Sequence, residues 1–235
     1  MREAERFQRH ARAARPTDRV RRPALHVALA PRMVRASPRY RIGAVDWRHE
    51  FDETGALLSG HFRLSSGLHS DRYLQCALIL QWPERARRIG DALGALLSAF
   101  DAAVVVGPAL GGVIVGHETA RALGVRCVFT ERKDGAMQLR RGFRFSPGEL
   151  AVVVEDVFTT GGSAREVIGV LKSYGVTPRA VGCIVNRSGK NPFEAEKLPL
   201  FALANVKAEA WAPDDCPLCK ARVPLVKPGS RAKPA

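Results

Sequence analysis

One segment constrains the fold of this chain more than any other, because it joins an apolar run, two acids and a glycine-rich turn. It reads Val-Val-Val-Glu-Asp-Val-Phe-Thr-Thr-Gly-Gly-Ser-Ala over residues 152–164. The apolar residues 150–155 predict a buried strand, and residues 161–174 predict a helix. A buried strand that leads directly into a helix is typical of α/β folds with a parallel sheet, in which ligands bind at the carboxyl ends of the strands.

The turn in this segment has the groups that bind a phosphate. Residues 159–163 place hydroxyl groups and consecutive backbone amides at the start of a helix, where negative charge is favoured. Glu155 and Asp156 at the end of the strand can accept hydrogen bonds from neighbouring sugar hydroxyls or bind hydrated Mg2+. Either half alone is better explained as a helix cap or a solvated strand end. Together they predict a site for a phosphorylated sugar, although not a P-loop, because the Gly-Lys-Ser/Thr ending is missing.

The rest of the chain continues the alternation of helices and strands. Apolar patterns predict helices over residues 45–59, 83–98 and 111–123, and extended segments over residues 62–64, 72–80, 102–106, 125–129 and 180–185. The polar residues 130–147 predict a loop or a hairpin. We therefore expect a parallel sheet with right-handed crossovers.

A second glycine-rich turn lies between the predicted strand 102–106 and the predicted helix 111–123. It reads Gly-Pro-Ala-Leu-Gly-Gly over residues 107–112. Such a turn can bring backbone N–H groups close to an anion. On its own, the hexapeptide is explained equally well as a tight connection between a strand and a helix.

The positive charge of the chain is concentrated at its start. Residues 1–41 hold twelve arginines and three acids and contribute +9 of the net charge of +14. The remaining +5 suits an enzyme that handles phosphates, and nucleic acid is not an expected partner. Residues 1–43 are expected to be a disordered basic extension, with an over-extended start, an RNA-binding arm and a transit peptide as alternatives.

Two further features bear on where the protein works. No apolar stretch is long enough to cross a bilayer as a helix, so no membrane is expected. Five cysteines are few and odd in number, which argues against a disulfide framework and suits a reducing compartment. The expected location is the cytoplasm.

Residues 152–164 resemble the signature of the type I phosphoribosyltransferases. The resemblance implies an α/β fold with a central, mostly parallel sheet flanked by helices, a small N-terminal hood and a mobile loop. It also implies that the acids contact the ribose of phosphoribosyl pyrophosphate (PRPP), and that the loop after them binds its 5-phosphate. The implied PRPP-binding residues are Glu155, Asp156, Val157, Phe158, Thr159, Thr160, Gly161, Gly162, Ser163, Arg132, Gly111 and Gly112. Mg2+ is the implied cofactor, bound mainly through the substrate, with Asp156 as a further candidate ligand.

Other segments resemble the orotate phosphoribosyltransferases in particular. Residues 60–70, Gly-His-Phe-Arg-Leu-Ser-Ser-Gly-Leu-His-Ser, are similar to the segment that covers the base in that family. The implied orotate-binding residues are Ser66, Gly67, Thr159 and Arg187. An arginine fork suits a planar carboxylate, although without the resemblance Arg187 would be interpreted as an ordinary exposed arginine.

The reaction implied by this resemblance belongs to pyrimidine biosynthesis. The ribose 5-phosphate of PRPP is transferred to N1 of orotate, which gives orotidine 5′-phosphate and pyrophosphate. A phosphoribosyltransferase for another nucleobase and a PRPP-binding regulator are the alternatives.

Residues 131–143 match the mobile catalytic loop of the same family. Arg132 and Lys133 match, and with Asp156 they form the implied catalytic set. Because relatives supply this loop to the neighbouring subunit, the resemblance implies a homodimer with shared active sites. A solvated basic hairpin is the alternative.

The loop departs from the best-known form of the family at several positions. In the loop, Ala136 and Gln138 stand where that form has a lysine and a histidine. Outside the loop, Ser65 and Gly111 stand where that form has lysines. We interpret the chain as a subtype with a Leu-Arg-Arg-Gly-Phe loop, in which Arg140 or Arg141 supplies the missing charge.

The C-terminal Cys-Pro-Leu-Cys segment, residues 216–219, resembles the tail of that subtype. A Cys-x-x-Cys pair is half of a zinc site, but no second pair and no suitably spaced histidine pair accompanies it. We expect two metal-free thiols, with zinc shared between subunits as the alternative. The expected organisation is the basic extension 1–43, a phosphoribosyltransferase domain 44–230 and a tail 231–235.

Overall fold

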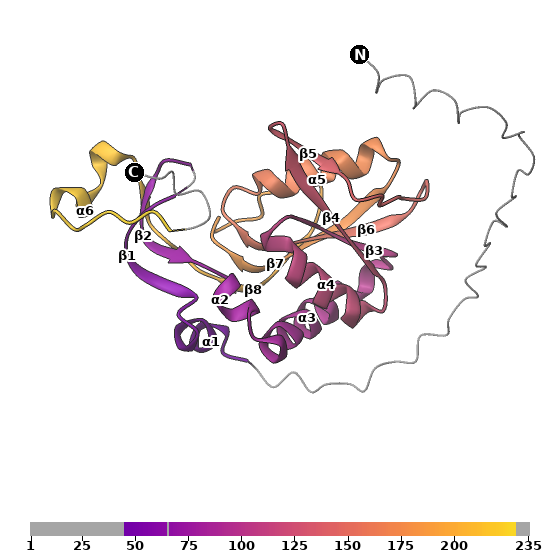
Figure 1. Cartoon of the computed structure of the whole chain (residues 1–235), viewed down its shortest axis with the longest axis horizontal. Helices are drawn as coiled ribbons and strands as arrows, with labels where there is room; N and C mark the ends of the chain where they lie inside the picture. Colours follow the sequence, from indigo (N-terminus) through magenta and orange to yellow (C-terminus); the bar gives the residue numbers. More distant parts are fainter. Residues whose placement is uncertain (1–44, 65, 229–235) are drawn as a thin grey trace, which may run out of the picture. The chain divides into compact units, whose positions relative to one another are not determined.

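The computed structural model describes residues 45–64 and 66–228 (Figure 1). The expectations for the extension 1–43, for the tail 231–235 and for Ser65 lie outside the described residues. No helix in the described part combines the length and the apolar character needed to cross a membrane.

A six-stranded sheet lies at the centre of the described residues. Its strand order is β5-β4-β3-β6-β7-β8, and each neighbouring pair is parallel except β4 and β5. The strands are β3 (Val104–Pro108), β4 (Arg126–Lys133), β5 (Ala136–Leu139), β6 (Leu150–Phe158), β7 (Thr177–Asn186) and β8 (Leu200–Asn205). The predicted central, mostly parallel sheet is confirmed.

Helices pack on both faces of this sheet, because successive residues of a strand point to opposite sides. Helices α3 (Pro83–Leu97) and α4 (Gly111–Leu123) share an apolar cluster with Val105 of β3. Helix α5 (Gly162–Ser173) belongs to a second cluster that contains Val106. Burial on both faces explains why the strand sequences are continuous apolar runs.

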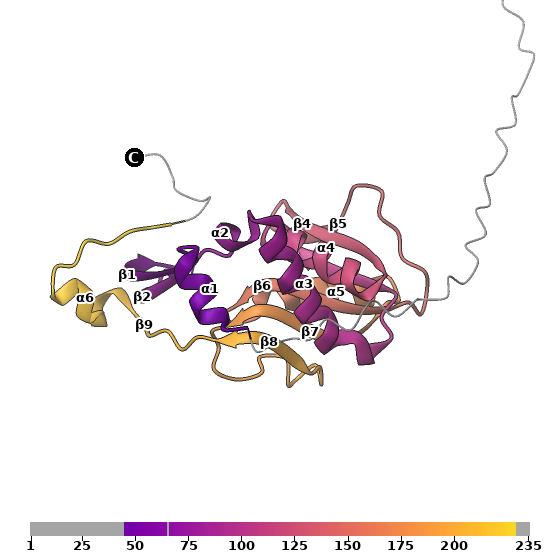
Figure 2. The same cartoon turned by 90° about the horizontal axis from the view of Figure 1, so that it is seen from below.

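A smaller, antiparallel sheet of three strands has the order β1-β2-β9. Strands β1 (Leu57–Arg63) and β2 (His69–Leu74) form a hairpin, to which β9 (Ala210–Trp211) is added. Figures 1 and 2 both show helix α6 (Pro217–Lys220) beside this hairpin. The hood that was predicted from the N-terminal part therefore also contains residues from the C-terminal part of the chain.

The remaining elements are short. They are α1 (Trp47–Glu53), α2 (Ala77–Leu80) and two 3-10 helices, Ser98–Phe100 and Pro213–Asp215.

Several of the predicted elements differ from the observed ones in their extent, and two of them differ most. The predicted helix 45–59 ends at Glu53 because Gly55 has a φ of +65°, which terminates the helix, and Leu57 already belongs to β1. The predicted extended segment 72–80 ends at Leu74, after which α2 forms. Strand β8 was not predicted at all, since its alanines have low strand propensity.

The polar residues 130–147 do contain a hairpin, which was one of the two predicted outcomes. Strand β4 continues to Lys133 and pairs antiparallel with β5, so the turn lies at Asp134 and Gly135. Positive φ angles at both turn residues match a tight hairpin turn.

Candidate active site

Three neighbouring parallel strands bring the predicted site residues to one edge of the central sheet. Strands β3, β6 and β7 are adjacent, and their carboxyl ends lie at Pro108, Phe158 and Asn186. The backbone amide of Arg187, just after β7, donates a hydrogen bond to the Phe158 carbonyl at 2.7 Å. The structure therefore places the two glycine-rich turns and Arg187 at the sheet edge where α/β proteins bind ligands.

The two acids lie within β6, which extends three residues beyond the predicted end of the strand. Asp156 faces α4, because a Cβ atom built on Gly111 would lie 2.4 Å from its Oδ1 atom. Glu155 is on the opposite side of the strand and accepts a hydrogen bond from Ser163 at the start of α5. Each acid thus stands beside one of the two strand-to-helix turns.

The turn between β3 and α4 requires its glycines. A Cβ atom on Gly107 would lie 2.5 Å from the Gly112 carbonyl oxygen, and one on Gly112 would lie 2.9 Å from the Val154 carbonyl oxygen. The Ala109–Leu110 peptide is cis, and the Leu110 side chain is 81% exposed. The backbone of this turn is packed against β6, and its apex is open to solvent.

The turn between β6 and α5 also depends on a glycine. Gly161 has a φ of +72°, and a Cβ atom there would lie 2.8 Å from the Phe193 ring. Thr159, Thr160 and Gly162 around it are exposed. The amides at the start of α5 and the hydroxyls before them are therefore accessible to an anion.

The surroundings of the acidic pair disfavour its charged forms. Burial, reinforced by the charge of Asp156, raises the pKa of Glu155 to about 8. Burial also raises the pKa of Asp156, although the Val157 amide, which donates to its Oδ1 atom at 2.9 Å, acts in the opposite direction. Hydroxyl donors or a hydrated cation would stabilise the charged forms.

Arg187 lies against the hairpin of the small sheet. Its Nη2 atom donates to the Ser70 Oγ atom at 3.2 Å and to the Arg72 carbonyl oxygen at 3.3 Å. Its Nε atom is buried and has no hydrogen-bond partner among the described residues. Burial lowers the pKa of Arg187, while the nearby Asp71 and Tyr73 act in the opposite direction. Arg187 is thus a half-buried cation with a buried, unused Nε donor, so it is not an ordinary exposed arginine.

The other two predicted orotate contacts lie in the turn between β1 and β2. Ser66 is exposed, and Gly67 has a φ of +86°. The Gly67 amide donates to the Leu64 carbonyl at 3.0 Å, so this donor is occupied within the turn.

The predicted catalytic loop forms the β4–β5 hairpin and the residues after it. Arg132 donates to the Gly135 carbonyl at 2.6 Å and to the Glu166 carboxylate of α5 at 2.7 Å. Lys133, the second predicted catalytic residue, is exposed. In this structure Arg132 forms an ion pair with Glu166 of α5 in the same chain.

The two arginines proposed to replace the missing loop cations share one partner. Arg140 contacts Glu131 at 2.9 Å, and Arg141 contacts the same carboxylate at 3.0 Å. Hydrogen bonding from Arg141 and the charges of both arginines lower the pKa of Glu131.

A group of residues outside the sheet edge was missed in the sequence. Cys216 and Cys219 lie beside His61 and His69, so the expectation that no histidine pair accompanies the cysteines is wrong. The histidines are about 150 residues away along the chain, beyond the range in which ligand motifs are recognised. The signal in the sequence was the pair of histidines within residues 60–70, the segment that resembles the base-covering segment of the family.

Comparisons with known proteins agree with this geometry. Residues 77–196 match the family model described as phosphoribosyl transferase domain. The chain is 51% identical over 181 residues to the orotate phosphoribosyltransferase of Pelotomaculum thermopropionicum, an alignment that covers 77% of this chain and 94% of the relative. It is 50% identical to the orotate phosphoribosyltransferase of Thermotoga maritima, with 77% and 95% covered.

A solved structure extends the likeness to the fold. The crystal structure of orotate phosphoribosyltransferase from Aeropyrum pernix superposes with a TM-score of 0.57 at 26% identity, and the match covers 66% of this chain and 91% of that one. The sequence identity to these relatives is about one half over nearly their full length, so the sequence and the fold indicate the same family. The chain belongs to the orotate phosphoribosyltransferase family.

Proposed function

We propose that the orotate phosphoribosyltransferase reaction takes place at the carboxyl edge of β3, β6 and β7. The enzyme transfers the ribose 5-phosphate of PRPP to N1 of orotate and releases pyrophosphate. The observation that carries the proposed location is the half-buried Arg187, whose buried Nε donor has no partner among the described residues. It lies at the same edge as two half-buried acids and two anion-binding turns.

The PRPP half of the site is proposed to lie around Glu155 and Asp156. Their carboxylates would accept hydrogen bonds from the ribose hydroxyls, and the amides and hydroxyls of residues 159–163 would bind the 5-phosphate. The turn at residues 107–112 lies next to Asp156 through Gly111 and would hold the pyrophosphate. A ligand with phosphates at both ends would place one phosphate at each of these two turns, with its ribose beside the acids between them.

The orotate half is proposed to lie between Arg187 and the residues that precede β2. The free Nε and the adjacent Nη2 of Arg187 would donate to the carboxylate or a ring carbonyl of orotate. Thr159, Ser66 and Gly67 are the other proposed contacts, with the Ser66 hydroxyl as the donor because the Gly67 amide is occupied.

Mg2+ is the proposed cofactor, and the residues fit it. Asp156 and Glu155 offer hard oxygen ligands, and both are held in surroundings that favour a positive partner. The chemistry that bound Mg2+ supplies is neutralisation of the charge on the departing pyrophosphate.

The reaction needs positioning more than proton transfer. PRPP would be fixed at its ribose and both phosphate ends, and orotate would be oriented by Arg187 with N1 facing the anomeric carbon. As pyrophosphate leaves, the ribose gains oxocarbenium character, which the nearby carboxylates favour. Closure of the loop would exclude water from the activated sugar.

The loop is proposed to act on the site of a second subunit in a homodimer. Arg132 would leave Glu166 and contact the pyrophosphate of the partner's PRPP, with Lys133 beside it and Arg140 or Arg141 in place of the lysine and histidine of the best-known loop. Residues 44–230 would form the catalytic domain, and the protein would work in the cytoplasm.

Mixed dimers test this arrangement. Arg132→Ala alone is expected to lower kcat about 10²-fold, by loss of charge stabilisation at the leaving group, whereas the exposed Arg144→Ala on the same segment should keep full activity. A purified heterodimer of one Arg132→Ala chain and one Asp156→Asn chain should recover one working site, because the intact loop of the second chain reaches the intact site of the first. A heterodimer as inactive as either parent would show that the loop serves its own subunit.

The base specificity can be tested directly. Purified protein with PRPP and Mg2+ is expected to consume orotate, measured by loss of its absorbance, and to leave adenine, hypoxanthine and uracil unchanged. Turnover of another base at a comparable rate would overturn the orotate assignment. Omission of Mg2+, with chelator present, should abolish turnover and tests the cofactor in the same assay.

A further inference from the structure

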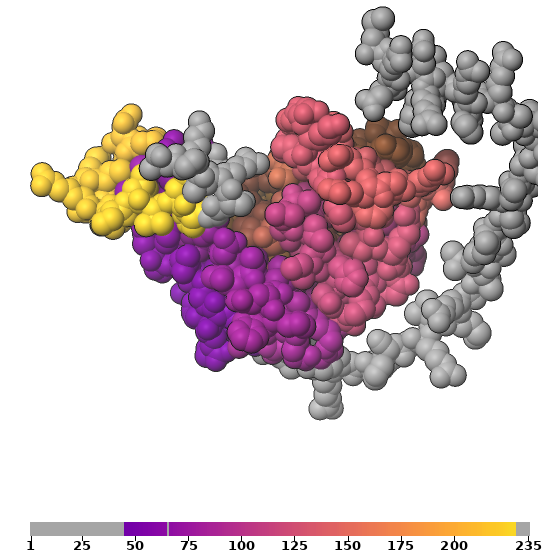
Figure 3. Space-filling view, viewed as in Figure 1, coloured from indigo at the N-terminus to yellow at the C-terminus, as the bar shows by residue number. Residues whose placement is uncertain are grey.

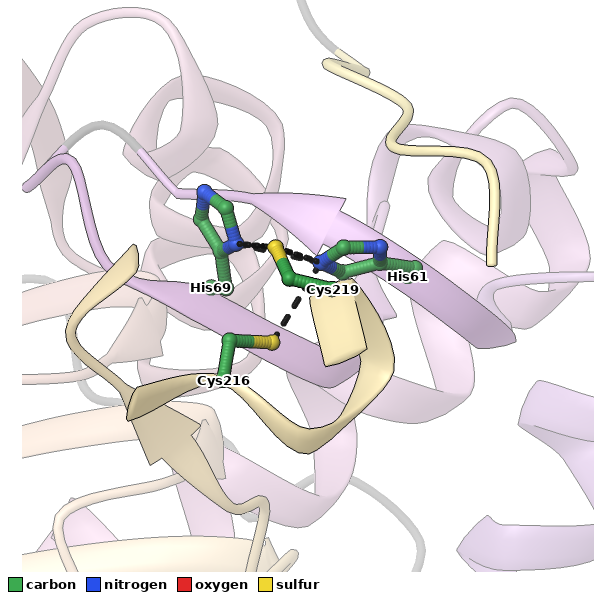
Figure 4. A group of neighbouring side chains, drawn as sticks. All are labelled: His61, His69, Cys216 and Cys219. Atoms are coloured by element: carbon green, nitrogen blue, oxygen red, sulfur yellow. Dashed lines mark hydrogen bonds between the residues drawn. The ribbon is translucent and has the colours of Figure 1, made fainter. Parts of the chain in front are cut away.

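Four side chains from the two ends of the described sequence converge at the small sheet. Figure 4 shows the Cys219 sulfur between the His61 and His69 rings, with the Cys216 sulfur directed at His61. His61, His69 and Cys216 are 3%, 5% and 0% exposed, and Cys219 is at the surface. One nitrogen or sulfur atom from each residue lies within 4.8 Å of the other three.

Four of the six distances between these atoms lie close to the edges of a tetrahedron around one zinc ion. Zn–N bonds of about 2.1 Å and Zn–S bonds of about 2.3 Å give edges of about 3.4 Å between two nitrogens and about 3.6 Å between nitrogen and sulfur. The His61 Nε2 atom lies 3.1 Å from the His69 Nδ1 atom and 3.4 Å from the Cys216 sulfur. The Cys219 sulfur lies 3.7 Å from His61 Nε2 and 3.2 Å from His69 Nδ1.

The orientation of His61 is that of a metal ligand. Its Nδ1 atom lies 2.8 Å from the Val223 carbonyl oxygen and must carry the proton to donate there. The Nε2 atom of the neutral ring then presents a lone pair to the centre of the group. A hydrogen bond from the other ring nitrogen to a carbonyl is the usual support of a zinc-bound histidine.

Hydrogen bonds alone account poorly for the group. Three heavy atoms surround the single lone pair of His61 Nε2 at 3.1, 3.4 and 3.7 Å, and one lone pair accepts one good hydrogen bond. A metal ion would use all four donor atoms, and two thiolates would balance the charge of a divalent cation.

Local backbone structure prepares the site. Between the paired residues Ser59–Arg72 and Phe62–Ser70, two residues of β1 face Asp71 alone, so a β-bulge includes His61. Bulges redirect side chains at sheet edges. On the other side, Cys216 immediately precedes α6 and Cys219 lies within it, which gives the Cys-x-x-Cys spacing of zinc-binding turns.

We infer that His61, His69, Cys216 and Cys219 form a structural zinc site that fastens the C-terminal segment to the β1–β2 hairpin. Four protein ligands leave no open position, so the site is structural and not catalytic. The fastened segment continues to Val226, which exchanges backbone hydrogen bonds with His61 and Arg63 at 2.8 and 2.9 Å. Figure 3 shows this yellow segment lying against the indigo hairpin.

The test measures metal in the full chain, purified without chelator or a metal-affinity step from zinc-supplemented cells. We expect one equivalent of zinc per chain by mass spectrometry, and its loss in the Cys216→Ser/Cys219→Ser variant. Cys127→Ser, a half-buried cysteine outside the group, is the matched control and should retain the zinc. Only traces of zinc in the wild-type protein, or an equal zinc content in the double variant, would contradict the assignment of a zinc site.

Cobalt provides a second readout that does not depend on the stability of a variant. Wild-type protein stripped of metal and loaded with Co2+ should show the visible bands and the thiolate charge-transfer absorption of tetrahedral Co2+, and zinc should abolish both. Thiol titration of the folded protein should find Cys219 protected with zinc and reactive after chelation. Octahedral Co2+ spectra, or equal reactivity with and without zinc, would contradict the assignment.

Discussion

Glu155→Gln and Asp156→Asn are each expected to lower kcat/KM for PRPP by about 10²-fold or more, the usual loss when one preorganised polar contact to a transition state is removed. Each substitution keeps the shape of the side chain and removes the negative charge that holds ribose hydroxyls or hydrated Mg2+. Initial rates at varied PRPP concentration measure the effect. Asp52→Asn, at an exposed position of α1, is the control and should leave the rate unchanged.

Glu155→Gln is also expected to stabilise the protein at high pH when no substrate is bound. The Glu155 pKa is raised from 4.5 to about 8 in the folded state, so the folded protein holds this proton more tightly than the unfolded chain. The contribution of this proton to the free energy of unfolding is fully present below the pKa of Glu155 in the unfolded chain and is lost as the pH rises toward 8. Each unit of difference between the folded and unfolded pKa corresponds to about 1.4 kcal/mol. The Tm of Glu155→Gln should therefore exceed that of the parent by an amount that grows from pH 5 to pH 8.

Scanning calorimetry without PRPP or Mg2+ separates this effect from catalysis. A variant that loses activity and gains stability shows that Glu155 is kept for ligand binding. If Glu155→Gln were inactive and also less stable at pH 8, its role would be structural. Full activity of both Glu155→Gln and Asp156→Asn would show that the two acids are not part of the PRPP site.

Arg187→Ala is expected to raise the KM for orotate about 10²-fold, because removing one partner of a buried ionic contact costs about 3 kcal/mol or more. The KM for PRPP should change little, since Arg187 faces the small sheet. Arg187→Lys should recover only part of the affinity, because an ammonium group cannot form the two parallel hydrogen bonds of a guanidinium. Arg179→Ala, at an exposed arginine of β7, the strand that precedes Arg187, is the control.

Arg187 also contacts Ser70 and Arg72, so its removal could loosen the hairpin. Measurement of Tm alongside KM distinguishes the two roles. An unchanged orotate KM, or an equal rise in the KM of both substrates, would show that Arg187 does not recognise the base.

The sequence was sufficient for the central sheet apart from β8, because the signals of the other strands are local. Continuous valines followed by acids and a glycine-rich turn define β6 and α5, and the helix predicted over residues 111–123 has the observed bounds. The predicted end of β6 was too early, because charged residues inside a strand look like a strand end when their partners in space are unknown.

The small sheet was the part that local signals could not define. Strand β9 has two residues and forms only because β2 offers an open edge, so its sequence carries no strand pattern of its own. The neighbours of Cys216 and the unused donor of Arg187 also depend on contacts between distant parts of the chain. The resemblance identified Arg187 as a contact of the base, but its burial became visible only in the structure.

The pairing of β2 with β9 has a consequence for synthesis on the ribosome. The central sheet, through β8, can assemble once residue 205 has left the exit tunnel. The β1–β2 hairpin, however, gains its remaining backbone partners only after residues 210–226 have also emerged. During that interval both edges of the hairpin have unpaired backbone groups, which favours association with other nascent chains. A stalled or truncated chain that lacks residues 210–226 should therefore keep a folded central sheet and expose unpaired strand edges that chaperones can bind.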